Sequence, residues 1–447
     1  MTAPSWLGRT GFFGEKRLGS IFTNDMYCGN FYGVSDMRRL KPALTRERKS
    51  RSWDRAPEEN GHQPAGPGIS SSRTSIIEAL LENGSMSRSD LASSLGLSRS
   101  ALTVLSRGLI EHGLILESSS SYDNQQTGRP SILLSLNAEH GYFIGAGLTE
   151  DPPMMVLTDL HGNSLAQHRM RDAEQPRAVA SAIEAGINEL IRVPKISRQR
   201  VLGIGVALSG YVDHAHGICL QSNALGWRDV AIAEIIERVT KLPTYVDNDA
   251  HAVATGQKLF GHARESKNFS IVMLGKKIGE GHYIHGRLHR GHTGAAGEIG
   301  HYTVVPGGEL CGCGKQGCLD MFATSSAILQ KAAESGLKTE TVAQLESIAA
   351  KGETRAIELL RHAGTMLGVV VANSIQMNNP ELVLIVDVVG FGNGFFTTST
   401  RQAIENNILP HLISKTRLEL HSVDKDFLAR SASSVAAHQF LIDRASY

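Results

Sequence analysis

Three cysteines lie within eight positions of one another in the segment GEIGHYTVVPGGELCGCGKQGCLD, residues 297–320. The thiolates of Cys311, Cys313 and Cys318 are soft metal ligands, and the glycines between them let the chain curl round one ion. His301 is the natural fourth ligand. A Cys₃His set is closed and tetrahedral, as in structural zinc sites, and it has no open position for an activated water. The sequence therefore predicts one structural Zn²⁺ per chain at these residues, with free thiols in a buried turn and a catalytic zinc as the alternatives.

The other two cysteines of the chain, Cys28 and Cys219, are isolated. An odd total of five, with three clustered, does not resemble the framework of a disulfide-rich secreted domain. The 45 basic and 44 acidic residues nearly balance, so an anionic partner must meet a local patch of charge. There is no run of about 18 apolar residues and no apolar secretory core, which leads us to expect a cytoplasmic protein with no membrane association.

Polar residues that suit a small hydroxylated ligand accompany the cluster. If one ring nitrogen of His301 binds zinc, the other remains as a fixed hydrogen-bond donor. Glu298 can accept hydrogen bonds from neighbouring hydroxyls, and Asn248 and Asp249 follow a predicted strand. Any one of these residues alone would more often cap a strand end. Together, several acceptors with mixed donors and few aromatic residues favour a polyhydroxylated small molecule.

The elements that would position these residues alternate between strand and helix from Gly141 onward. VLGIGVAL has the pattern of a buried strand, DVAIAEIIERVT that of an amphipathic helix, and PELVLIVDVV that of another buried strand. This alternation predicts an α/β domain, assigned to residues 137–447, in which binding groups lie at strand ends.

Residues 72–136 have a different pattern, with three short helical segments followed by two short strands. Ser87, three residues before Asp90, resembles a capping box, and Ser98 begins the next helix. In that third helix the apolar residues repeat at helical spacing. They leave a polar face made of Arg99, Ser100, Thr103 and Arg107.

The two strands, predicted at 114–117 and 131–136, enclose a polar loop tipped by Arg129. A helix-turn-helix followed by such a hairpin is a winged one. Polar and basic groups on the third helix suit base edges in the major groove, and an arginine at the wing tip suits a narrow minor groove. We therefore expect this domain to bind double-stranded DNA through these residues. The alternative is a small three-helix bundle that contacts other proteins.

Residues 1–71 show no sustained apolar periodicity and end in a segment rich in charge, proline and glycine. They predict a disordered N-terminal extension. The alternative is that translation starts further downstream, for example at Met37.

Four segments resemble the ROK family of repressors and sugar kinases, and in particular its NagC/XylR-type transcriptional regulators. They are GAAGEIGH, CGCGKQGCLD, VDNDAHAVATGQ and the wing segment QTGRPSILLSLN. The resemblance covers roughly residues 72–440. It implies an actin-like (ribonuclease H-like) domain of two lobes that close over the ligand. It also implies a C-terminal helix, around 431–445, that packs on the N-terminal lobe.

The resemblance also implies roles for individual residues. Zinc would be held by the four residues already named, and Asp249 occupies the position of the catalytic base in the family's kinases. At position 320 the family usually has Glu, and the shorter Asp puts that contact in doubt. The implied sugar contacts are Gly210, Asn223, Asn248, Asp249, Glu298, His301 and Asp320.

Three segments depart from the kinases of the family. The Asp-x-Gly-Gly-Thr phosphate loop is replaced by GLTED at 147–151, the Gly-Thr-Gly loop by GKK at 275–277, and the glycine-rich adenosine segment by VDVV at 386–389. We therefore expect no kinase activity. The sequence favours a repressor of sugar metabolism genes that acts as a homodimer or homotetramer and is controlled by a sugar or sugar phosphate. The alternatives are an active ATP-dependent sugar kinase and a regulator controlled by a protein partner.

Overall fold

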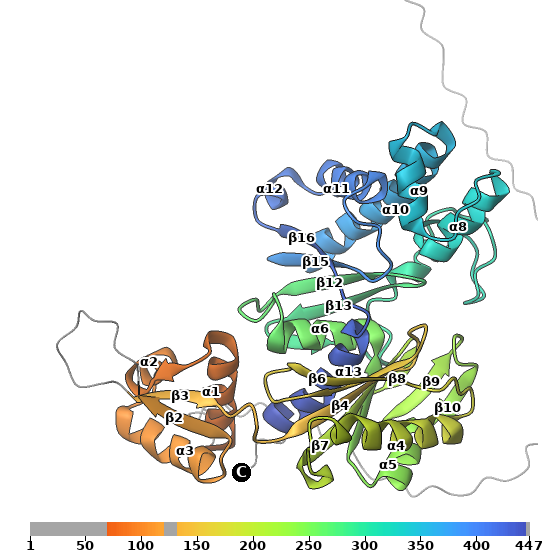
Figure 1. Cartoon of the computed structure of the whole chain (residues 1–447). Coiled ribbons are helices and arrows are strands. Elements are labelled where there is room, and N and C mark those ends of the chain that lie inside the picture. Colours follow the sequence, from red (N-terminus) through yellow and green to blue (C-terminus); the bar gives the residue numbers. More distant parts are fainter. Residues whose placement is uncertain (1–68, 120–131, 444–447) are drawn as a thin grey trace, which may run out of the picture. The chain divides into compact units, whose positions relative to one another are not determined.

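The computed structural model describes residues 69–119 and 132–443 (Figure 1). Most of the expected N-terminal extension and the predicted wing tip with Arg129 lie outside these ranges. Helix α1 begins at Ile69, so the regular structure starts three residues before the expected domain boundary at 72.

The first part of the described chain is a winged helix-turn-helix. Ser87 caps α2 by accepting a hydrogen bond from the Asp90 amide at 3.1 Å, and Ser98 caps α3 by accepting one from Ala101 at 3.1 Å. Both helix starts predicted from the sequence are confirmed. The elements are α1 Ile69–Asn83, β1 Met86–Ser87, α2 Arg88–Ser94, α3 Arg99–Glu111, β2 Ile115–Ser119 and β3 Ile132–Leu136.

The three strands of this part form an antiparallel sheet in the order β1-β3-β2. Strands β2 and β3 are the predicted hairpin, and each begins one residue later than expected. Their register pairs Ile115 with Leu136, and both side chains are buried against the helices. The hairpin is therefore held in place by the same apolar core that packs the three helices.

The rest of the chain contains two five-stranded sheets with the same topology. The sheet of the first lobe has the order β6-β5-β4-β7-β11, and that of the second has the order β14-β13-β12-β15-β16. In each lobe the first three strands are antiparallel and the last two join the first in parallel. This repeated arrangement is the actin-like fold expected from the sequence. A small sheet, β10-β9-β8, extends the first lobe.

The strands of the first lobe are β4 Tyr142–Gly147, β5 Met154–Thr158, β6 Ser164–Arg169, β7 Val201–Leu208, β8 Tyr211–Asp213, β9 Ile218–Ser222, β10 Trp227–Val230 and β11 Thr244–Asn248. Those of the second are β12 Phe269–Leu274, β13 Ile278–Ile284, β14 Arg287–His289, β15 Leu382–Asp387 and β16 Arg417–Ser422.

Helices cover both sheets, with α4 and α5 on the outer face of the first and α10 and α11 on the outer face of the second (Figure 1). None of the described helices is long and apolar enough to cross a membrane. The helices are α4 Pro176–Arg192, α5 Ile232–Thr240, α6 Asp249–Phe260, α7 Asp320–Ala323, α8 Ser325–Glu334, α9 Val342–Ala350, α10 Thr354–Asn378, α11 Phe395–Asn407, α12 Pro410–Ile413 and α13 Phe427–His438, with short turns η1 Arg198–Arg200, η2 Ile299–His301 and η3 Gln439–Asp443.

The C-terminal helix α13 returns to the first lobe, as expected, and two glycines allow its close approach. Gly145 of β4 and Gly205 of β7 are paired neighbours in the sheet. A Cβ added to them would lie only 1.9 Å from the Ala429 carbonyl oxygen and 1.8 Å from that of Ala432. The helix begins at Phe427, four residues earlier than expected, and its regular part ends at His438 before the turn η3.

Candidate zinc centre, effector cavity and DNA-reading helix

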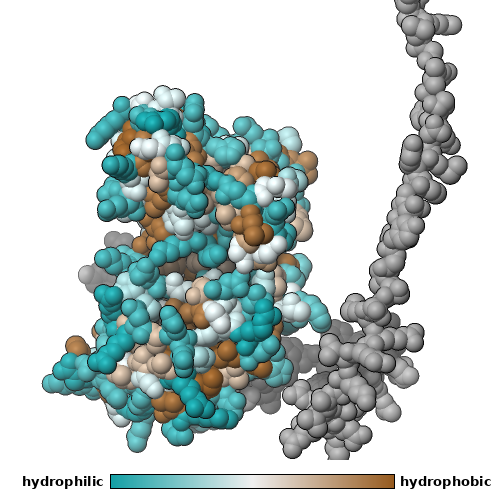
Figure 2. Space-filling model, turned by 90° about the vertical axis from the view of Figure 1, so that its right-hand side faces the viewer, coloured by the Kyte–Doolittle hydropathy of each residue, from teal (hydrophilic) through white to brown (hydrophobic). Residues whose placement is uncertain are grey.

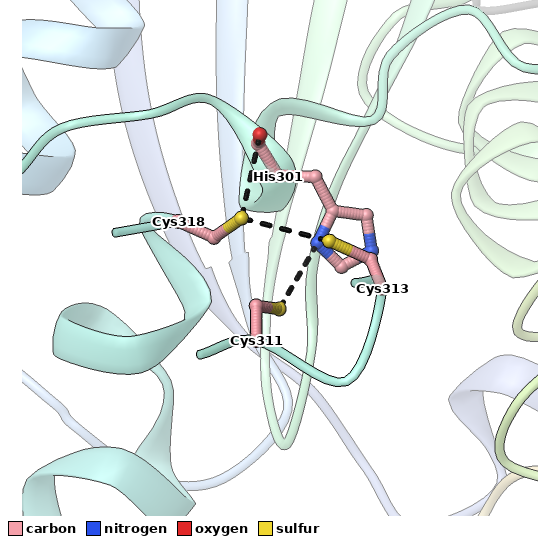
Figure 3. Close-up of side chains that lie close together, drawn as sticks. All are labelled: His301, Cys311, Cys313 and Cys318. Carbon is pink, nitrogen blue, oxygen red and sulfur yellow. Dashed lines mark hydrogen bonds between the residues drawn. The ribbon is translucent and has the colours of Figure 1, made fainter. Parts of the chain in front are cut away.

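The four predicted zinc ligands converge on one point (Figure 3). The sulfurs of Cys313 and Cys318 are 3.6 Å apart, and Cys311 Sγ is 3.7 Å from His301 Nδ1. All four ligand atoms lie within 4.8 Å of one another. In a tetrahedral zinc site, neighbouring sulfurs are about 3.8 Å apart and a sulfur and a nitrogen about 3.6 Å apart. The donor set and its spacing therefore fit Zn²⁺ with little rearrangement.

The loop reaches this geometry because its glycines adopt conformations that other residues avoid. Gly314 and Gly317 have φ angles of 90° and 70°. A Cβ on Gly317 would also lie 1.6 Å from the Val305 carbonyl oxygen. The Cys311 amide donates to the Lys315 carbonyl at 2.8 Å. This hydrogen bond closes a turn that contains Cys311 and Cys313 and ends shortly before Cys318.

Next to the cluster is a cavity of about 170 Å³ between the lobes. Figure 2 shows a hollow between the upper and lower lobes on the face that it draws. All seven residues predicted to contact a sugar line this cavity, and they come from separate parts of the chain: Gly210, Asn223, Asn248, Asp249, Glu298, His301 and Asp320.

Two of these residues also have structural roles. Asn248 caps α6 by accepting hydrogen bonds from the amides of Ala250 and His251, at 2.8 and 3.4 Å, and its amide donates to the Gly210 carbonyl at 2.9 Å. Its position at a strand end thus serves both the helix and the cavity wall. One Asp320 oxygen accepts from the Ile278 amide at 3.2 Å, which leaves the other to face the cavity.

Asn223 connects the cavity to the cysteine loop. Its side-chain amide donates to the Gly312 carbonyl at 3.1 Å, and its oxygen accepts from Gln221 at 3.0 Å. The residue lies just after β9 in the first lobe, whereas Gly312 lies between Cys311 and Cys313. A ligand that contacts Asn223 is therefore one hydrogen bond from the cysteine loop.

His301 presents its two ring nitrogens to different surroundings. Nδ1 faces Cys311, while Nε2 lies 3.9 Å from a Glu298 carboxylate oxygen. A metal ion held at Nδ1 would leave Nε2 as a hydrogen-bond donor toward the cavity.

The carboxylates of the cavity share a buried environment that disfavours charge. Burial raises the pKa of Asp249 from 3.8 to about 6. Burial also raises the pKa of Glu298 to about 7, and the charge of Asp249 adds to the rise. Two acceptors held close together with little solvent suit hydrogen bonds from neighbouring hydroxyls more than they suit an anion.

The other residues that line the cavity include Tyr211 and Lys277, which the sequence did not indicate as ligand contacts. The Lys277 ammonium lies 3.7 Å from an Asp320 oxygen. In the sequence, Lys277 stands out only as part of GKK, where kinases have a phosphate loop. A lysine in a segment expected near several carboxylates could also have indicated a contact with them. Tyr211 directly follows Gly210 in the motif LSGYVD, which was the only hint of its position.

A buried ionic network lies beneath the cavity and also escaped the sequence analysis. Asp247, next to Asn248, contacts Arg290 at 2.6 Å and lies 3.3 Å from both His214 and His251. Burial alone would raise the pKa of Asp247, but the His251 hydrogen bond and the Arg290 charge outweigh it and lower the pKa. Because Arg290 follows β14, this pair joins the two lobes.

The predicted DNA-contacting residues of α3 are all exposed: Arg99, Ser100, Thr103 and Arg107. Val104 lies among them with 67% of its surface exposed. The polar pattern of the helix gave no indication that this apolar side chain belongs to the same face. An exposed methyl-bearing side chain on such a face suits contact with a thymine methyl group. Arg129 lies outside the described residues, so its part in this face stays a prediction.

The two segments that replace the phosphate loops contact other parts of the chain. Glu150 accepts a hydrogen bond from the Leu428 amide at 3.2 Å, at the N-terminus of α13. Burial raises the pKa of Glu150 to about 8. Asp151 forms an exposed ion pair with Lys276 at 2.7 Å, so GLTED of the first lobe is linked to GKK of the second.

Comparison with known proteins agrees with both halves of this architecture. The xylose repressor of Bacillus spizizenii is 27% identical over 368 residues, which cover 82% of this chain and 94% of that protein. The glucokinase of Halalkalibacterium halodurans is 30% identical over 246 residues, 52% of this chain and 74% of the kinase. The crystal structure of a ROK family transcriptional regulator, a homologue of the E. coli MLC protein, superposes with a TM-score of 0.72 at 26% identity and covers 84% of this chain and 98% of that one.

Matches to whole families divide the chain in the same way as its structure. Residues 69–126 match the MarR family, in the region of the winged helix. Residues 144–432 match the ROK family and include both lobes and the first half of α13. This second match spans well over half of the sequence, and the chain therefore belongs to the ROK family.

Proposed function

We propose that this protein is a DNA-binding transcriptional repressor of sugar metabolism genes, controlled by a sugar or sugar phosphate bound between its lobes. The observation that carries the proposal is the single cavity lined by all seven predicted sugar contacts in a chain that also has a winged helix with an exposed basic face. The similarity to a xylose repressor over most of both chains supports the same function.

The proposal includes one structural zinc ion held by His301, Cys311, Cys313 and Cys318. The close spacing of three thiols and an imidazole nitrogen supports it. When bound, zinc would supply folding energy and a fixed loop, since four protein ligands leave no position for a reacting water. In this arrangement His301 and the Asn223–Gly312 hydrogen bond orient the cavity wall toward the effector.

The proposal excludes phosphoryl transfer, although Asp249 is kept. Phosphoryl transfer depends on positioning and on stabilising charge at the phosphates. Here the buried Glu150 side chain contacts α13 from the segment that replaces the first phosphate loop, and the Asp151–Lys276 ion pair joins this segment to the one that replaces the second. Asp249 instead serves as a hydrogen-bond acceptor for the effector.

Helix α6 offers a direct connection between effector and DNA. Its first residue, Asp249, lines the cavity, and Lys258 near its other end donates to Glu82 of α1 at 2.9 Å. An effector that prefers one arrangement of the lobes would change the placement of α6 and, through it, of α1. Only a difference in affinity between two arrangements can shift DNA binding. In a homodimer or homotetramer, twofold-related α3 helices would read a pseudo-palindromic operator.

The test combines a ligand screen with DNA binding. Common sugars and their 6-phosphates are screened by thermal shift, and the best ligand is then titrated against the full chain by calorimetry. We expect binding that Glu298→Ala abolishes, no ATP-dependent turnover, and a changed affinity for DNA of the upstream region. Lys195→Ala, outside both sites, is the matched control. ATP-dependent turnover that disappears in Asp249→Asn would contradict the proposal.

The DNA-binding half has its own variant. Arg99→Ala should reduce discrimination between operator and unrelated DNA by about 1–3 kcal/mol if the guanidinium makes a bidentate base contact. The affinity of the parent protein should fall steeply with salt because phosphate contacts release counterions. Arg192→Ala, an exposed arginine on α4, should change neither quantity. Equal discrimination by Arg99→Ala and the parent would remove α3 from base reading.

A further inference from the structure

A second group of metal-ligating side chains lies away from the cysteine cluster. His262 follows the C-terminal end of α6, and Glu419 and His421 lie on β16, the edge strand of the second sheet. One ligand atom from each of the three lies within 4.8 Å of the others. Since residues two apart on a strand point to the same side, Glu419 and His421 form one half of the group, and His262 completes it from a different element.

The arrangement of the three side chains suits one ion. His421 Nε2 is 3.1 Å from Glu419 Oε2, close to the separation of about 3.0–3.4 Å between neighbouring ligand atoms of a bound transition metal. The rings of His262 and His421 lie 4.1 Å apart and 31° from parallel. His262 is exposed in the turn after α6, so rotation of its ring can bring a nitrogen to the shared point.

The neighbouring charges leave the ligand atoms available. Arg417 Nε contacts Glu419 Oε1 at 3.2 Å, so it holds the carboxylate by one oxygen while the other faces His421. Burial and the neighbouring His421 lower the pKa of His262, which favours the neutral imidazole that a metal requires. Arg264 acts in the same direction on His262, and Arg430 lines the adjoining cavity.

The group also has space beside it. His262 and His421 line a cavity of about 350 Å³ whose other walls include Gln257, Asp424 and Arg430. An ion with three protein ligands keeps open coordination positions, in contrast to the closed Cys₃His set. Those open positions can take water or a small oxygen or nitrogen ligand from this cavity.

We propose that His262, Glu419 and His421 bind a divalent first-row transition metal ion, of the zinc and nickel type, as a second metal site. Two imidazoles and one carboxylate select such ions over Mg²⁺ and Ca²⁺, which prefer oxygen ligands alone. The site joins the C-terminal end of α6 to β16. It uses neither the effector cavity nor α3, although it lies at the end of the helix that the proposed function places between them.

The experiment uses the full chain after its tightly bound zinc has been measured. Co²⁺ and Ni²⁺ are then titrated. We expect one further equivalent of either ion, seen as saturable heat for Ni²⁺ and as weak visible absorption for Co²⁺, with no thiolate-to-cobalt charge-transfer band. Mg²⁺ should give no such signal.

Three variants assign the ligands. His262→Ala and His421→Ala should each weaken this binding by at least about 10- to 100-fold, and Glu419→Gln should also weaken it. The matched control is His216→Ala, an exposed histidine that pairs with Asp213, and it should bind like the parent. Because His262 is exposed, its replacement should leave the melting temperature of the protein unchanged when no ion is bound at this site.

Three results would overturn the proposal. The first is the absence of saturable binding by the parent. The second is unchanged binding by His262→Ala, which would leave only an ion pair between His421 and Glu419. The third is a thiolate band in the cobalt spectrum with loss of the original zinc, which would place the added ion in the cysteine cluster.

Discussion

The cavity lined by the predicted sugar contacts differs from GLTED and GKK, the segments predicted to replace the phosphate loops of kinases. In the cavity, all predicted sugar contacts are retained and brought together. At the loops, Glu150, Asp151 and Lys276 form contacts within the protein instead. Binding a sugar requires only complementary hydrogen bonds in the ground state, whereas transferring a phosphoryl group requires positioning and charge stabilisation at the phosphates. Under the proposed function, this difference separates the recognition of a sugar from its phosphorylation.

The largest expected effect is the loss of the cavity when the metal loop is broken. Cys313→Ser should remove zinc and destabilise the protein by more than about 3 kcal/mol, because structural zinc contributes folding energy directly. Elemental analysis and thermal unfolding measure both effects. Cys219→Ala changes a buried cysteine outside the cluster and should keep a full equivalent of zinc. Sugar binding by a zinc-free Cys313→Ser protein would separate the cavity from the metal.

The second effect is an increase in the free energy of unfolding, and it concerns Glu150 in the segment GLTED. Glu150 has a pKa of about 8 in the folded protein and 4.5 as its ordinary value. The folded state therefore retains a proton that the unfolded state releases, so stability falls as pH rises from about 4.5 to 8. Glu150→Gln should be more stable than the parent by about 1–3 kcal/mol at pH 8, with the gain shrinking toward pH 5. Denaturant unfolding at several pH values measures this, and a pH-independent difference would contradict it.

A smaller effect is expected in the cavity itself. Asp249 has a pKa of about 6, so its carboxylate becomes fully ionised, and a better acceptor for hydroxyls, above that pH. Sugar affinity should rise by at least about fourfold between pH 5.5 and 7.5, provided that zinc stays bound. Calorimetry across this range should show a smaller rise for any residual binding by Asp249→Asn than for the parent, because Glu298, with a pKa of about 7, still ionises in this range. The same slope in both would assign the titration to another group.

The smallest effect is expected at the exposed pair between the loops. Lys276→Ala should leave the melting temperature nearly unchanged, because exposed ion pairs contribute little and salt screens them. It should also leave the protein without kinase activity, since it restores neither the glycines nor the hydroxyl of a phosphate loop. A coupled assay with ATP and magnesium checks the second point. Turnover by this variant would mean that the ion pair alone had blocked the nucleotide.

Features whose residues lie close together along the chain could be predicted from the sequence. The cluster of His301 and three cysteines could be predicted because its members lie close together along the chain, and the caps Ser87 and Ser98 because capping is local. The actin-like pair of lobes was expected from the family resemblance, and the two five-stranded sheets agree with it.

Groups formed by tertiary packing had no comparable signal. His262 and His421 come together only because α6 ends beside β16, and Asp247 meets Arg290 only across the two lobes. Each of these contacts depends on how separate elements pack, which spacing along the chain does not specify.

The pairing of Gly145 and Gly205 with α13 has a consequence for how the chain folds during synthesis. The groove that these glycines form in the first lobe is filled by residues 427–438, which leave the ribosome long after β4 and β7. The apolar face of these two strands therefore stays uncovered while the whole second lobe is made. Long-range closure of this kind slows folding and exposes surface that can aggregate. A truncation within α13 should thus harm the first lobe, nearly 300 residues upstream, more than the second lobe that precedes it directly in the chain.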